Sequence, residues 1–67
     1  MVWTELKRLE NSCVVLVNSY LDHARSLRWV VLVRPNDTAL EPFQADEHEL
    51  NDAVGRLVEM AREKHLL

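Results

Sequence analysis

Apolar residues recur at steps of three and four along the first third of the chain. The stripe consists of Leu6, Leu9, Cys13, Leu16, Tyr20, His23 and Leu27. This spacing places side chains on one face of an α-helix, and no Gly or Pro interrupts the segment. We therefore predict one long helix over residues 3–27.

A second interpretation of the same segment rests on its valines. The sequence VVLV occurs at residues 14–17 and again at residues 30–33. Valine favours strands because its branched Cβ restricts χ1 in a helix. Two paired strands joined by residues 18–28 are therefore the alternative. The spacing of three and four continues on both sides of the valines, which favours the helix, but the choice at residues 13–17 stays open.

A strand is predicted over residues 28–34, where the apolar sequence WVVLV lies between two arginines. The next four residues, PNDT at 35–38, have the composition of a turn. Residues 39–44 then return as the second strand of a short hairpin. This strand belongs at a sheet edge, because Pro42 has no N–H for a ladder hydrogen bond. We expect Phe43 to anchor it to the core.

The last third of the chain is predicted to be a helix from Asp46 to about His65. Asp46 and Glu49 have the spacing of a capping box at a helix start. The apolar stripe of this helix consists of Leu50, Ala53, Val54, Leu57, Val58 and Ala61. Gly55 costs about 1 kcal/mol relative to alanine inside a helix. We expect it to allow close packing against the sheet or to contact a partner's backbone.

These elements predict a small α+β domain spanning residues 1–67. The order is α-β-β-α: a long N-terminal helix, a short β-hairpin and a C-terminal helix, with both helices on one face of the sheet. A core this small rarely supplies more than about 3–5 kcal/mol, and self-association is a common remedy.

A homodimer is predicted from the length and composition of the first helix. At 1.5 Å per residue, 25 residues span roughly 37 Å, which exceeds the roughly 28 Å diameter of a compact chain of this size. Valine and leucine together supply 20 of the 67 residues, and the middle of this helix is apolar nearly all round. The predicted dimer interface contains Leu6, Leu9, Cys13, Leu16, Val17 and Tyr20.

The net charge of −3 is unevenly distributed. Residues 1–34 contain five basic and three acidic residues, whereas residues 35–67 contain three basic and eight acidic ones. Six acids and no Lys or Arg lie between Asp37 and Asp52, an acidic band that would steer the chain towards a basic partner surface. The candidate partner-binding residues are Asp37, Leu40, Glu41, Phe43 and Glu47.

A nucleic-acid interface is the alternative to this protein-binding surface. Arg25, Arg28 and Arg34 lie before and at the two ends of the predicted strand, and a dimer would double them. Phosphate binding depends on positive potential, however, and the whole chain is acidic. The leading hypothesis is a non-enzymatic interaction module that binds a larger protein as a homodimer. The alternative is a dimeric nucleic-acid-binding transcriptional regulator.

The sequence does not have the residue patterns of an enzyme or a metal site. Cys13 has apolar neighbours, and His23, His48 and His65 lack zinc-ligand spacing. One glycine cannot form a phosphate-binding loop. We therefore expect no enzymatic activity, no cofactor and no metal.

Compartment is predicted from the same composition. The longest apolar runs have five residues, and Glu5 and Glu10 interrupt any apolar leader. A single cysteine is typical of a reducing compartment. We expect a cytoplasmic chain without membrane association.

Overall fold

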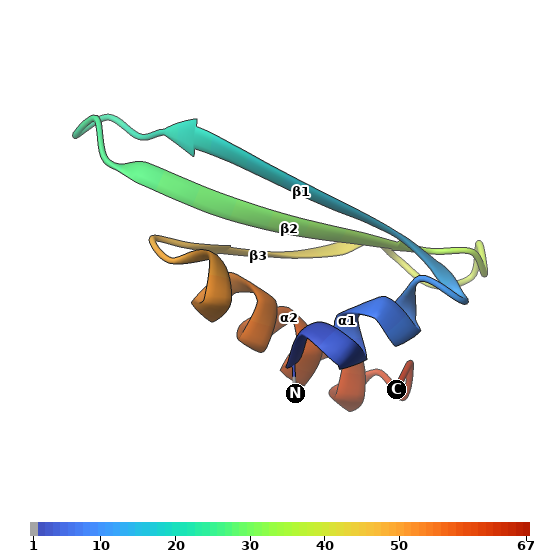
Figure 1. Ribbon diagram of the computed structural model, residues 1–67. Coiled ribbons are helices and arrows are strands. Elements are labelled where there is room, and N and C mark those ends of the chain that lie inside the picture. Colours follow the sequence, from blue (N-terminus) through green and yellow to red (C-terminus); the bar gives the residue numbers. More distant parts are fainter. Residues whose placement is uncertain (1) are drawn as a thin grey trace.

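A computed structural model describes residues 2–67 as a three-stranded antiparallel sheet with a helix before it and a helix after it (Figure 1). This confirms the prediction of a small α+β domain, although the sheet has three strands. The elements are α1 (Val2–Leu9), β1 (Cys13–Leu21), β2 (Leu27–Pro35), β3 (Phe43–Glu47) and α2 (Leu50–Glu63).

The predicted long helix over residues 3–27 is wrong. Helix α1 ends at Leu9, three residues form a turn, and β1 begins at Cys13. The alternative of two paired valine-rich strands is correct, since Val15 lies opposite Val33 and Val17 opposite Val31. Their connection is residues 22–26 and not the predicted 18–28, because both strands continue beyond the valines. Residues 13–17 are all apolar, so their hydrophobic pattern is compatible with both a helix and a strand. The β-branched valines among them favour the strand.

The β1–β2 hairpin is the longest feature of the fold. Its register runs unbroken from the pair Cys13–Pro35 to the pair Leu21–Leu27. The Asp22 carboxylate closes the turn by accepting the backbone N–H groups of Ala24 and Ser26, both at 2.9 Å. Strand β3 pairs only with Trp29–Val33 of β2, so the end of the hairpin extends beyond both β3 and α2 (Figure 1).

The third strand and the second helix begin later than predicted. The predicted strand over residues 39–44 is largely loop, and β3 instead occupies Phe43–Glu47. Asp46 therefore lies in β3 opposite Val30 and does not cap a helix. Helix α2 starts at Leu50, and Glu49 precedes it without a side-chain capping bond to the described chain.

The core lies between one face of the sheet and the two helices (Figure 1). Val31 and Val33 of the central strand are fully buried, whereas their neighbours Val30 and Leu32 are not. The predicted stripe of α2 is confirmed: Ala53, Val54, Leu57, Val58 and Ala61 are buried, and Leu50 packs at their edge. Phe43 is the predicted anchor of its strand, with 7% of its surface exposed.

Gly55 does not allow the close packing that its position suggested. A Cβ at this residue would meet no described atom within 4 Å apart from the helix's own backbone. The glycine therefore weakens α2 without a packing reason within residues 2–67.

Candidate functional site

The face of the sheet turned away from the helices is uncovered by any element within residues 2–67 (Figure 1). Alternate side chains of a strand point to opposite faces, so the neighbours of the buried Val31 and Val33 point to this side. We call it the open face. Its apolar side chains are Val14, Leu16, Tyr20, Val30 and Leu32. Leu16 is 50% exposed, which leaves an apolar centre in contact with water.

Strand β1 is also uncovered along its outer edge. It pairs with β2 on one side, and no other strand of the described chain lies on its second side. Apolar side chains on the helix-facing side of the hairpin are exposed as well, because the end of the hairpin extends past the helices and α2 does not contact β1. Leu21 is 64% exposed, Leu27 48% and Val17 42%. Apolar groups therefore surround the free edge of β1 on both faces.

A polar cluster connects all three strands at one end of the open face. Asp46 accepts hydrogen bonds from the Tyr20 hydroxyl and from Arg28 Nε, the latter at 2.8 Å. Arg28 Nη1 lies 2.9 Å from His48 Nε2. The hydrogen bond from Tyr20, and then that from Arg28, lowers the pKa of Asp46 below its ordinary value.

The hydrogen bonds of this cluster hold the three strands together. The hydrogen bond to Asp46 raises the pKa of Tyr20, and the same carboxylate raises the pKa of Arg28. At neutral pH the phenol therefore keeps its proton and the guanidinium its charge. A nucleophile or general base requires the opposite shift in a tyrosine.

The structure divides the predicted dimer-interface residues into two groups. Leu6, Leu9 and Cys13 are at most 5% exposed and belong to the chain's own core, so their side chains are not available to a partner. Leu16, Val17 and Tyr20 lie on β1 and are at least 42% exposed. The second group therefore belongs to the uncovered strand and not to a helix.

The predicted partner-binding residues do not form one patch. Phe43 is in the core, with Lys64 Nζ 5.2 Å from its ring centre, and Glu47 is half-buried at the end of β3. Asp37, Leu40 and Glu41 are exposed in the loop over residues 36–42. The Asp37 carboxylate accepts the backbone N–H of Ala39 at 2.9 Å, so it also stabilises this loop.

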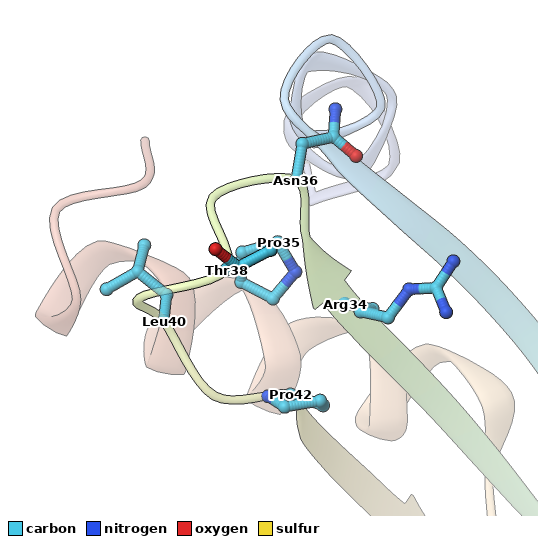
Figure 2. Close-up of a pocket in the computed structure, with 6 residues that line it drawn as sticks. All are labelled: Arg34, Pro35, Asn36, Thr38, Leu40 and Pro42. Carbon is cyan, nitrogen blue, oxygen red and sulfur yellow. The ribbon is translucent and has the colours of Figure 1, made fainter.

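The same loop borders an open hollow of about 430 Å³. It is lined by Arg34, Pro35, Asn36, Thr38, Leu40 and Pro42, as Figure 2 shows. The hollow holds one charged side chain, Arg34, at its margin. It is a candidate for a small contact.

The three arginines of the alternative hypothesis lie apart. Arg25 is in the hairpin turn with φ 60°, and Arg28 is paired with Asp46. Arg34 is six residues further along β2 than Arg28, roughly 20 Å at the rise of a strand. A phosphate-binding patch would therefore have to draw on two separate exposed guanidinium groups.

Neither a metal site nor a membrane-spanning helix is found in the part of the chain that the structure describes. No three His, Cys, Asp or Glu side chains there are grouped to hold a metal ion. None of the helices over residues 2–67 is long and apolar enough to cross a membrane. Comparisons with protein-family models, with curated proteins and with solved structures gave no match.

Sequence reasoning missed Val14, Val30 and Leu32 as open-face residues, and it missed the Arg28–Asp46 pair. The repeated VVLV was the signal that would have found the apolar residues. If the two copies pair, alternate residues of both necessarily share one face. No comparable signal exists for Arg28 and Asp46, whose contact depends on the third strand.

Proposed function

We propose that this chain is a non-enzymatic protein-interaction module that works as a homodimer in the cytoplasm. The observation that carries the proposal is the apolar open face, which lies on the side of the sheet opposite the helices. Contiguous apolar surface bordered by polar groups is typical of protein-binding sites. Arg28, Asp46 and Arg34 border the apolar centre here.

The partner in this proposal is a larger folded protein that offers an apolar surface to Leu16, Val30 and Leu32. An uncovered three-stranded face with apolar side chains in its centre fits such a surface better than a small ligand, which requires a concave pocket. The exposed acids Asp37 and Glu41 lie outside this face. They would favour a partner with basic residues near the contact and would speed its association.

Site-specific photocrosslinking tests the proposal in the cells that produce the chain. A photoreactive amino acid replaces Leu32, whose side chain lies at the centre of the open face and away from the free β1 edge. The control position is Thr4, which is exposed on α1 in the helical layer. Products are separated by mass after irradiation.

The expected result is a discrete product much heavier than two chains from position 32 and none from position 4. In a second variant the photoreactive residue at position 32 is combined with Leu16→Lys, because Leu16 lies opposite Leu32 on the open face. A charge there should abolish the heavy product without disturbing the buried core. The same heavy product from both positions, or none from position 32, would contradict the proposed function.

A further inference from the structure

We propose that the free edge of β1 pairs antiparallel with β1 of a second copy, with the twofold axis at Val17. Two chains would then share one continuous six-stranded sheet, with all four helices on one side. This inference rests on the proposed function and specifies how its homodimer forms.

The direction of the backbone groups along β1 follows from the two ends of the hairpin. The N–H of Asp22 donates to the carbonyl of Ser26 at 3.1 Å, and that of Asn36 donates to the carbonyl of Ser12 at 2.9 Å. In an antiparallel ladder every second residue bonds to the neighbouring strand. Even-numbered residues of β1 therefore face β2, and odd-numbered residues present their N–H and C=O groups to the free edge.

Nothing in the sequence of β1 protects this edge from pairing. Natural edge strands carry lysines, prolines or bulges, or are short. The β1 sequence CVVLVNSYL has neither charge nor proline, and its nine-residue register with β2 is unbroken. Polar backbone groups beside apolar side chains form a template for another strand.

A second copy fits this template because β1 is complementary to itself. Pairing about Val17 places Val15 opposite Ser19 and Cys13 opposite Leu21, so that all nine residues overlap. The odd residues, which present free backbone groups, then face each other in five pairs. Each pair exchanges two hydrogen bonds, which gives about ten across the edge. No like charges face each other in this pairing, because β1 contains no charged residue.

The exposed end of the hairpin gives a second reason for choosing a copy of this chain. In this pairing the Leu21 end of one β1 lies beside the Cys13 end of the other. That end carries α1, which packs against β1 in each chain. The helical layer of one copy thus extends towards Leu21 of the other, and Val17 lies at the axis between the two layers. An unrelated strand would not supply this cover.

Paired proline variants test the edge in the full chain. Val17→Pro removes an N–H that faces the free edge, so the β2 ladder stays complete. Asn18→Pro is the matched control, since it removes an N–H that bonds to Val30. Sedimentation equilibrium at micromolar concentration should give twice the 7.8 kDa chain mass for the unmodified chain and 7.8 kDa for folded Val17→Pro. Asn18→Pro should lose its circular dichroism signal.

Disulfide cross-linking fixes the register even if the proline variant fails to fold. Val17→Cys places two thiols directly opposite each other, where Cα atoms are about 5.5 Å apart and a disulfide forms. Ser19→Cys separates its thiols by four residues along the strands, roughly 13 Å, beyond disulfide reach. Both variants carry Cys13→Ala. Mild oxidation should link Val17→Cys to a dimer at least tenfold more completely than Ser19→Cys.

Three results would overturn the inference. They are a folded unmodified chain at 7.8 kDa throughout, a Val17→Pro dimer as tight as the unmodified one, and cross-linking through Ser19→Cys instead of Val17→Cys. The first would leave the edge to a strand of another protein. The first result would also remove the homodimer from the proposed function. Binding to a larger protein is judged separately, because a heavy photocrosslink from position 32 does not require the β1 pair.

Discussion

The two edges of the sheet differ although both strands pair with the same central strand. Strand β3 has five residues, follows Pro42 and contains Asp46 and Glu47. Strand β1 has nine residues without a charge. Helix α2 packs against β3, whereas α1 touches only part of β1. The comparison teaches that one edge of this sheet is short, charged and backed by a helix, whereas the other has none of the features that usually protect an edge strand from pairing.

The largest loss of stability should follow from a substitution in the core between the sheet and the helices. Leu57→Ala removes a fully buried side chain of α2 and should lower the free energy of unfolding by about 2–5 kcal/mol. Leu16→Ala makes the same change on the open face, where half of the side chain contacts water. It should cost less than about 1 kcal/mol. Urea unfolding at low micromolar concentration measures both, and equal losses would abolish the distinction between the two sides.

Removing the protection of β3 should make the two edges alike. In the double variant Gln44→Val and Glu47→Val, a polar and a charged residue of this short strand become β-branched and apolar. Each assembly would then have further strands able to pair, so open-ended growth should replace a closed species. Light scattering should rise with time and concentration in the double variant only. A variant that keeps the mass of the unmodified chain would show that the short strand, Pro42 and Asp46 are enough to protect β3.

Lowering the pH should weaken the hydrogen bonds of Asp46, which connect β3 to β1 and β2. The lowered pKa of Asp46 means that its carboxylate stabilises the fold fully above its unfolded-state pKa, near pH 4. This contribution is lost as pH falls through the folded-state pKa. The stability difference between the unmodified chain and Asp46→Asn should therefore be constant above about pH 5 and shrink below pH 4. A stability difference that does not change with pH would show that the charge of Asp46 does not stabilise its contacts with Tyr20 and Arg28.

The smallest change in stability is expected from a substitution at Gly55 of α2. Gly55→Ala adds a methyl group in open space within a helix, so it should raise the free energy of unfolding by about 0.5–1 kcal/mol. Thermal unfolding measures the change. If the variant is less stable, Gly55 contacts something outside the described chain, and the binding surface extends to α2.

The sequence predicted the covered helix α2 better than the uncovered strand β1. Helix α2 was predictable because its far side is polar, so that only one period fits its apolar stripe. Residues 13–17 of β1 are apolar at every position, so the local pattern does not distinguish the two faces of a strand from the one face of a helix. They offered a false helical stripe from Leu6 to Leu27. The strand β3 was placed too early because Asp46 and Glu49 have the spacing of a helix cap.

The candidate site was predictable only as a set of apolar residues. Leu16, Val17 and Tyr20 were selected for their hydrophobicity, and the structure places them on an exposed strand. Leu6 and Leu9 were selected on the same grounds and lie in the core. Whether an apolar side chain is covered depends on where α1 and α2 come to lie, and the local pattern carries no record of that.

The position of α2 after the sheet has a consequence for biosynthesis. The hairpin ends at Pro35, yet five of the twelve buried apolar residues belong to α2, which ends at Glu63. At 5–20 residues per second, a ribosome completes α2 about one to six seconds after it has added Pro35. During that interval the core-facing side of the valine-rich hairpin lacks the cover of α2. Chaperones that bind such segments would therefore meet this chain before its core exists.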